Sequence, residues 1–90
     1  MTRDELLIGE YLSAARRKAE VTQQSIADHI GKHVQFISNI ERNVSPPPPY
    51  VIRAYIETCR IQEKDFLSMM IDKRRNWVEK EIFGRLKKRR

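Results

Sequence analysis

Cysteine and histidine are scarce in this sequence, which has one cysteine and two histidines among its 90 residues. A single cysteine excludes an internal disulfide framework, and the set is too small for a structural zinc cluster of Cys and His. Although His29 and His33 are four residues apart, Gly31 lies between them, so we expect their rings to lie on different elements and to bind no metal. Cys59 is expected to be a small buried apolar residue in a reducing cytoplasm, with redox sensing as the alternative.

Long apolar runs and catalytic clusters are also missing. No apolar run approaches the roughly 20 residues of a membrane-spanning helix, and the N-terminal segment MTRDELLIGE lacks the basic-then-apolar pattern of a secretory signal. We therefore expect the chain to be a whole, soluble protein of the cytoplasm. No serine, histidine and carboxylate are spaced so as to meet, and no glycine-rich phosphate loop occurs, so the sequence predicts neither an enzyme nor a cofactor.

The sequence does have an uneven basic charge. Lys and Arg number 18 against 12 Asp and Glu, a formal net charge of +6. Residues 1–71 contain equal numbers of basic and acidic side chains, so the whole excess lies in residues 72–90. A basic balance favours an anionic partner, either a nucleic acid or an acidic membrane surface. The last six residues, 85–90, are expected to contact DNA phosphates. The alternatives are a contact with RNA polymerase, a toxin or an acidic membrane, and a solvated, frayed end.

Apolar residues at helical spacing predict an all-α protein of five helices, with no strand signal. The first helix is expected over residues 4–19. Acidic residues lie near its start and the basic run Arg16-Arg17-Lys18 lies near its end, where each sign is favourable to the helix dipole. Its inner face is expected to consist of Ile8, Leu12 and Ala15.

Capping residues set the limits of the next two helices. Thr22 stands where an N-cap is expected and Gly31 can end a helix in the left-handed conformation, so a second helix is expected over residues 23–30. A third helix is expected to begin near Val34 and to close at Asn43, one of the few non-glycine residues that tolerates that conformation. Its buried residues are expected to be Ile37 and Ile40.

The four consecutive prolines at 46–49 can form neither a helix interior nor a central strand, so they predict a stiff connector rather than a ligand for a PxxP-binding domain. Pro49 can be the first residue of a fourth helix that ends near Arg60. The inner face of that helix is expected to consist of Ile52, Ile56 and Cys59. A fifth, longer helix is expected from Glu63 to about Phe83. Its broad apolar side contains Phe66, Leu67, Met70, Ile71, Trp77, Val78 and Ile82.

Two short helices joined by a tight turn at Gly31 have the geometry that lets one helix lie on the DNA backbone while the next enters the major groove. Residues 8–66 resemble the phage repressor/Cro (XRE) family of helix-turn-helix proteins. The matching pieces are Thr22-Gln23, Ile26-Ala27, Ile30-Gly31 and Ile37-Ser38-x-Ile40-Glu41-Arg42, followed by a proline-bearing loop and a fourth helix with Ile52 and Ile56. The resemblance implies a repressor-like five-helix bundle with an extended last helix. We therefore expect a helix-turn-helix DNA-binding domain at 1–71 and a basic helix extension and tail at 72–90.

The resemblance also implies roles for individual residues. Arg16 is expected to pair with Glu41 and tie the first helix to the third, the alternative being two solvated charges. His33 stands where the family has a serine or threonine cap, and is expected to be a weaker cap. The outward positions of the third helix are implied to read bases: Val34, Gln35, Ser38 and Asn39. The positions expected to contact phosphates are Thr22, Gln23, Lys32, His33, Arg42, Asn43 and Ser45.

The sequence thus predicts a sequence-specific DNA-binding transcription regulator that occludes or recruits polymerase at a promoter. The alternatives are an antitoxin of a toxin–antitoxin pair that also binds its own promoter, and a docking module or coactivator without sequence preference. The expected partners are double-stranded DNA and a second copy of the chain, with a toxin or RNA polymerase as a further candidate. The dimer interface is expected to contain Met70, Ile71, Trp77, Val78 and Ile82. The alternative is that the fifth helix folds back on its own core, with Trp77 as a lid.

Overall fold

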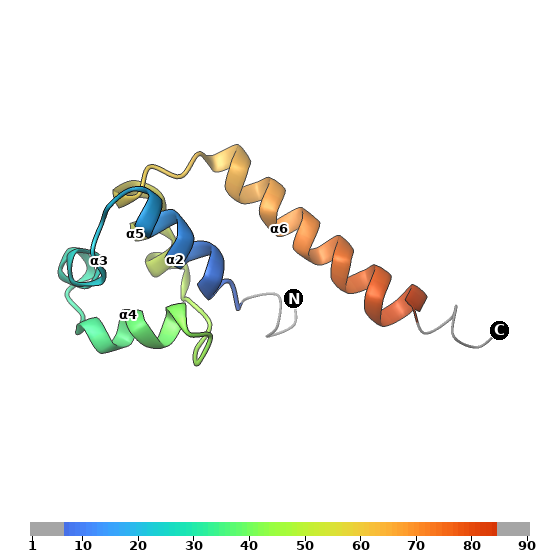
Figure 1. The fold of residues 1–90 in the computed structure, drawn as a ribbon, viewed down its shortest axis with the longest axis horizontal. Coiled ribbons are helices and arrows are strands. Elements are labelled where there is room, and N and C mark those ends of the chain that lie inside the picture. Colours follow the sequence, from blue (N-terminus) through green and yellow to red (C-terminus); the bar gives the residue numbers. More distant parts are fainter. Residues whose placement is uncertain (1–6, 85–90) are drawn as a thin grey trace.

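Helices account for almost all of the regular structure in the computed structural model, which describes residues 7–84 of the chain. Over this range the chain contains five α-helices, one π-helical turn and no strand, which confirms the predicted all-α fold. In chain order they are α2 (Gly9–Lys18), α3 (Gln23–Ile30), α4 (Val34–Glu41), α5 (Pro49–Thr58), α6 (Glu63–Val78) and the π-helical turn η1 (Glu79–Phe83). Helices α2 to α5 form a bundle, from which α6 extends (Figure 1). The predicted tail at 85–90 lies outside the described residues.

The sequence predicted that the first helix begins at residue 4, but α2 begins at Gly9. Ile8 is its N-cap and makes no side-chain cap; instead, the N–H of Gly9 donates to Asn43 Oδ1 at 2.8 Å. A β-carbon on Gly9 would lie 2.5 Å from the carbonyl oxygens of Ile40 and Glu41. The start of α2 is therefore set by its close approach to the end of α4, which only glycine permits. The part of the predicted helix before residue 7 lies outside the described range.

Helix α3 has the bounds that the capping residues predicted. The Thr22 hydroxyl accepts a hydrogen bond from the N–H of Ser25 at 3.0 Å, and Gly31 ends the helix with a φ of 68°. The following N–H, of Lys32, turns back to the carbonyl of Ala27 at 2.9 Å. This tight turn joins α3 to α4. At the far end of α4, Asn43 has a φ of 61°, the left-handed conformation that the sequence predicted there.

The core lies where α2, α3, α4 and α5 meet. Its buried residues are Ile8, Leu12, Ile26, Ala27, Ile37, Ile40, Val51, Tyr55 and Cys59. The predicted inner face of α5 was partly wrong, because Ile52 and Ile56 are only half-buried while Val51 and Tyr55 are fully buried. Relative to the predicted inner face, α5 is rotated so that the Tyr55 ring points into the core, where its hydroxyl donates to Glu41 of α4.

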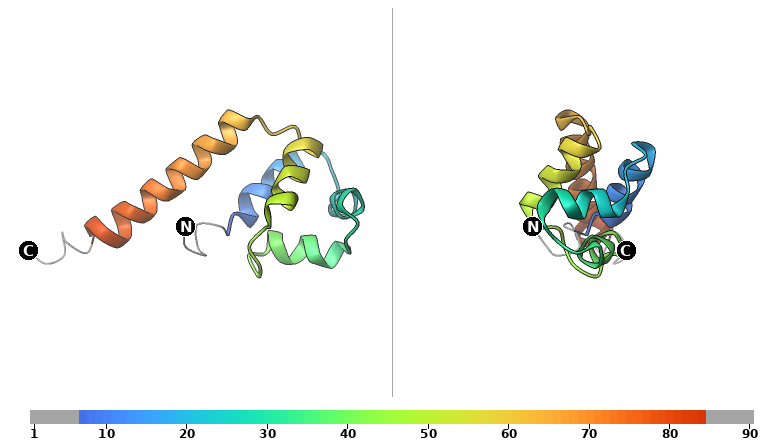
Figure 2. Two further views of the ribbon diagram at one scale, coloured as in Figure 1. Left: turned by 180° about the vertical axis from the view of Figure 1, so that it is seen from behind. Right: turned by 90° about the vertical axis from the view of Figure 1, so that its left-hand side faces the viewer.

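Helix α6 packs on the bundle through its first turns only. Phe66 contacts Tyr11 edge-on, with ring centroids 6.1 Å apart, and Met69 and Met70 also pack against the core. Beyond them α6 leads away from the bundle (Figure 2), so the alternative in which it folds back with Trp77 as a lid is wrong. Its exposed apolar side chains, together with those of η1, are Leu67, Ile71, Ile82 and Phe83. Among the described helices, none has the length and apolar character needed to cross a membrane.

Candidate nucleic-acid interface

Helix α4 has one buried side and one open side. Ile37 and Ile40 are buried in the core. The residues on the other side are exposed or half-buried: Val34, Gln35, Ser38 and Asn39. Figure 1 shows α4 at the edge of the bundle, with no other element beyond it. The four positions that the sequence analysis assigned to base reading therefore share one accessible surface.

Three polar side chains form a chain of hydrogen bonds along this surface. Gln35 Nε2 donates to Asn39 Oδ1 at 2.9 Å, and Arg42 Nη2 donates to the same oxygen at 2.7 Å. The residues are spaced by four and three positions, which places them next to one another on a helix. These two hydrogen bonds link Arg42, a predicted phosphate-contacting residue, with two predicted base-reading residues, Gln35 and Asn39.

On the inner side of α4, a carboxylate joins all four helices of the bundle. Arg16 of α2 contacts Glu41 through both ends of its guanidinium, Nε to Oε2 at 2.7 Å and Nη2 to Oε1 at 2.9 Å. Gln23 of α3 donates to Oε1 at 3.1 Å, and the hydroxyl of Tyr55 of α5 donates to Oε2. Arg16 also donates to the carbonyl of Val21 at 3.0 Å. The orientation of α4 is thus fixed from three sides by hydrogen bonds to one residue.

The charges of this cluster stabilise one another. Burial alone would raise the pKa of Glu41, but hydrogen bonds from Arg16, Tyr55 and Gln23 outweigh it and hold the pKa below its usual 4.5. The hydrogen bond to Glu41 raises the pKa of Arg16 despite burial. Burial, followed by the hydrogen bond to Glu41, raises the pKa of Tyr55 far above its usual 10. The cluster therefore consists of a carboxylate, a guanidinium and a neutral phenol.

A comparison with known proteins bears directly on this arrangement of α3, turn and α4. A helix-turn-helix family model matches residues 12–66, which is more than half of the chain. The chain belongs to the helix-turn-helix family, of the repressor/Cro (XRE) type. Neither the curated proteins nor the solved structures contain a match to it. Because the family is one of DNA-binding regulators, this helix-turn-helix protein is a DNA-binding regulator.

The predicted phosphate contacts before α4 lie at the start of α3 and in the turn of the helix-turn-helix. Thr22 caps α3, and the amide of Gln23 is engaged with Glu41. Lys32 is exposed, with its ammonium 5.8 Å from the ring centroid of Phe36. His33 is the N-cap residue of α4, as the sequence predicted, but its side chain makes no cap hydrogen bond. The imidazole ring of His33 is exposed and makes no hydrogen bond that would orient it toward α4.

The predicted contacts after α4 are divided between the surface and the fold. Arg42 is exposed and half-buried Ser45 follows the turn that ends α4. Asn43 has a structural role, because its Oδ1 accepts the hydrogen bond of Gly9 that begins α2. Of the seven predicted phosphate contacts, Lys32 and His33 thus precede α4, Arg42, Asn43 and Ser45 follow Glu41, and Thr22 and Gln23 lie at the start of α3. Two of them, Gln23 and Asn43, also hold the bundle together.

Sequence reasoning missed two residues on which the helix-turn-helix depends. Gly9 lies against the last carbonyls of α4, and Tyr55 reaches Glu41 from α5. Tyr55 follows Val51 by four residues, the spacing of one helix face, and that signal could have identified it as inward-facing. No local signal marks Gly9, because its constraint comes from a segment more than thirty residues away.

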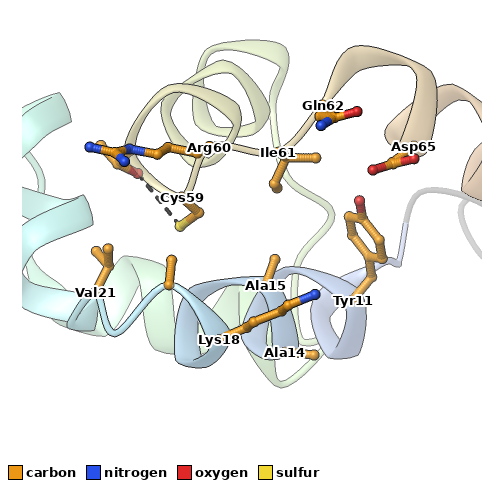
Figure 3. Close-up of a pocket in the computed structure, with 12 residues that line it drawn as sticks. Tyr11, Ala14, Ala15, Lys18, Val21, Cys59, Arg60, Ile61, Gln62 and Asp65 are labelled. Atoms are coloured by element: carbon orange, nitrogen blue, oxygen red, sulfur yellow. Dashed lines mark hydrogen bonds between the residues drawn. The ribbon is translucent and has the colours of Figure 1, made fainter.

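A groove of about 960 Å³ lies away from α4, between α2 and the connection from α5 to α6 (Figure 3). Ala14 and Ala15 line it on the α2 side, and Cys59 and Thr58 line it on the other. Burial raises the pKa of Cys59 above its usual 9.0, which keeps it a thiol and a poor nucleophile. In this helix-turn-helix protein the cysteine thus contributes to packing, as the sequence predicted.

Proposed function

We propose that this protein regulates transcription by recognising specific duplex sequences, with α4 as the helix that enters the major groove. The observation that carries the proposal is the division of α4 into a side fixed by Glu41 and an open side of adaptable polar residues. The major groove of B-DNA accommodates an α-helix. A helix held from three sides meets the groove at a set angle, which gives its outward side chains a fixed register on the bases.

The base-reading residues in this proposal are Val34, Gln35, Ser38 and Asn39. A glutamine amide can donate to and accept from the same adenine, and Val34 can pack on a thymine methyl group. Backbone N–H groups at the start of α3 and α4, which have no intrahelical partner, would bind phosphates. The side chains proposed to assist them are Thr22, Gln23, Lys32, His33, Arg42, Asn43 and Ser45. These contacts position the protein on the duplex and carry no sequence information themselves.

Selection from random duplexes tests the proposal. The full chain should enrich one defined motif, and Gln35→Ala should relax the preference at one base pair by about 1–3 kcal/mol. Lys32→Ala is the matched control, because loss of a phosphate contact should weaken binding to all sequences alike. Flat enrichment by the wild-type chain would contradict sequence-specific reading and would favour a general docking role on anionic surfaces.

We further propose that the active form is a homodimer joined through α6 and η1. Of the five residues expected at the interface, Ile71 and Ile82 are exposed, and Trp77 and Val78 are half-buried. The fifth, Met70, packs on its own bundle. Trp77 also lies beside the guanidinium of Arg74, 5.5 Å from the ring centroid. A second copy would cover the apolar side chains that the bundle leaves open.

The charge along α6 favours an antiparallel pair. Residues 63–72 contain three acidic side chains and one basic side chain, whereas residues 73–84 contain four basic and two acidic ones. Antiparallel pairing brings each acidic half against the basic half of the other copy. The helix and its π-helical turn span about 30 Å at 1.5 Å per residue, so the two bundles would be separated by a distance close to the 34–36 Å of one DNA turn.

The sequence predicted a boundary between two parts of the chain at residue 71. Helix α6 crosses this position without a break, so the two parts differ in charge and packing and are not separated by a linker. We propose that residues 1–71 form the DNA-reading unit and residues 72–90 the basic extension. Such a protein would act where the DNA is, in the cytoplasm that the sequence predicted.

An antitoxin is the second candidate, because the same open apolar side of α6 could cover a toxin. Purification from its natural host would distinguish the two, since an antitoxin should be recovered with a stoichiometric partner chain. The homodimeric regulator proposed first should be recovered without a second kind of protein chain.

A further inference from the structure

We propose that Arg42 determines which base Asn39 reads, by holding the Asn39 amide in one orientation. The inference rests on the proposed function of α4 as the helix that reads bases. It gives Arg42, which the sequence placed among the phosphate contacts, a second role as a positioning residue for its neighbour.

The argument begins with the chemistry of the guanidinium group. Arginine has five N–H donors and no acceptor. The atom of Asn39 that lies 2.7 Å from Arg42 Nη2 must therefore be the amide oxygen, and the NH₂ group must point the other way. An unassisted asparagine presents either end with similar ease, since the two ends have the same shape. The contact with Arg42 removes that freedom.

The same oxygen is also engaged by Gln35. Its Nε2 donates to Asn39 Oδ1 at 2.9 Å, so the oxygen accepts two hydrogen bonds. A carbonyl oxygen has two lone pairs, and both are used. Asn39 is left with two N–H donors and no free acceptor, whereas Gln35 keeps its own oxygen and one further N–H.

These inventories predict different bases for the two amides. Adenine presents an acceptor and a donor in the major groove, N7 and the N6 amino group, and it pairs with an amide that offers both. Gln35 retains both and is matched to adenine. Asn39 offers only donors and is matched to guanine, whose N7 and O6 are both acceptors, whereas thymine presents a single acceptor beside its methyl group.

Removal of the Arg42 guanidinium should therefore change the base preference of Asn39 and not only the affinity of the protein for DNA. In Arg42→Met an unbranched apolar side chain replaces the guanidinium and its donors, so one lone pair of Asn39 becomes free and the amide can turn over. Adenine then becomes an acceptable partner. We expect the discrimination against adenine at this base pair to fall by about tenfold, the size of one good side-chain contact to a base edge.

The experiment measures binding of the full chain to four duplexes that differ only at the base pair read by Asn39. That base pair is identified as the one at which Asn39→Ala loses its preference in selection from random DNA. Arg42→Lys is the rescue variant, because an ammonium also only donates and should retain the wild-type preference. Lys32→Met is the control for loss of a cation that does not touch Asn39, and it should weaken all four duplexes by the same factor. Thermal unfolding of each variant confirms that the exposed substitutions leave the fold intact.

The outcomes separate this inference from the function on which it rests. Preference of the wild type for a G·C pair in either orientation, with reduced discrimination in Arg42→Met and its return in Arg42→Lys, supports it. Preference of the wild type for an A·T pair in either orientation overturns it, as does a loss in Arg42→Met that is uniform over the four duplexes. A wild-type chain that enriches no motif overturns the proposed function and this inference together.

Discussion

The hydroxyl of Tyr55 donates its hydrogen bond to the same Glu41 oxygen, Oε2, that Arg16 Nε contacts. A phenol from α5 and a guanidinium from α2 thus share one acceptor on α4. The side chain of Glu41 is only 4% exposed, so nearly all of the compensation for its buried charge comes from these two partners and from Gln23.

Tyr55→Phe should lower the free energy of unfolding by about 1–3 kcal/mol, because a buried carboxylate loses a donor while the ring still fills the core. Urea unfolding measures the change. Tyr50→Phe is the matched control, because Tyr50 is exposed at the surface, and it should change stability by less than about 0.5 kcal/mol. Equal stability of the two variants would show that the Tyr55 hydroxyl contributes nothing.

The pKa of Glu41 predicts acid sensitivity with a defined sign. The pKa is lower in the folded chain than its usual 4.5, so the carboxylate stabilises the fold above that pH. This stabilisation should be lost as the pH falls through 4.5 toward the lowered pKa. Unfolding measured over a pH series should show the difference between the wild type and Glu41→Gln shrinking in that range. A difference that stays constant with pH would contradict the assignment of the charged form.

Gly9→Ala should destabilise the chain by about 1–3 kcal/mol, because the added methyl group would meet two backbone carbonyls at 2.5 Å and force α2 away from α4. Thermal unfolding is a sufficient measurement. In Gly84→Ala the new carbon lies in helical backbone with its nearest neighbour at 3.3 Å, so this variant is the control and should change stability little.

The proposed dimer predicts a mass in solution of twice 10.7 kDa by light scattering. Ile71→Asp should reduce the mass to that of the monomer, because a charge would be buried in the interface. Ser68→Ala, at an exposed polar position of the same helix, should leave it unchanged. For an antiparallel pair, chains carrying Leu67→Cys should form disulfides with chains carrying Ile82→Cys and not with one another. A monomeric wild type would end the proposal.

The basic tail should contribute affinity without sequence preference. Each neutralised phosphate adds roughly 0.9 to the slope of log affinity against log salt, so four engaged side chains among residues 85–90 would add about 3–4 units. Deletion of these residues should reduce the slope by that amount and leave the selected motif unchanged. An identical slope in the truncated chain would assign the tail to another partner.

Sequence patterns predicted the elements of this fold whose limits are set locally. Thr22 and Gly31 act on residues within one turn of themselves, and the bounds of α3 follow from them. The Arg16–Glu41 pair could be named in advance because it belongs to a recurrent family arrangement, and the two side chains are in contact.

The features that escaped prediction depend on distant segments. Helix α2 begins at Gly9 because the Gly9 N–H donates to Asn43 and its backbone lies against the last carbonyls of α4. No periodicity in residues 1–20 reveals these contacts. The inward position of Tyr55 depends in the same way on Glu41. The hydrogen bonds of Asn39 also involve neighbours, but amide orientation is a matter of side-chain geometry that residue spacing alone leaves open.

The separation of the two sides of α4 has a consequence for the evolution of its operator. Substitutions on the open side do not touch the residues that hold the helix, so a duplicated gene could acquire a new target without passing through an unstable protein. The hydrogen bonds through Asn39 limit this freedom, because a new residue there also changes the acceptor available to Gln35 and Arg42. Divergent copies should therefore differ at these three positions together, with each substitution favourable only in the presence of the others.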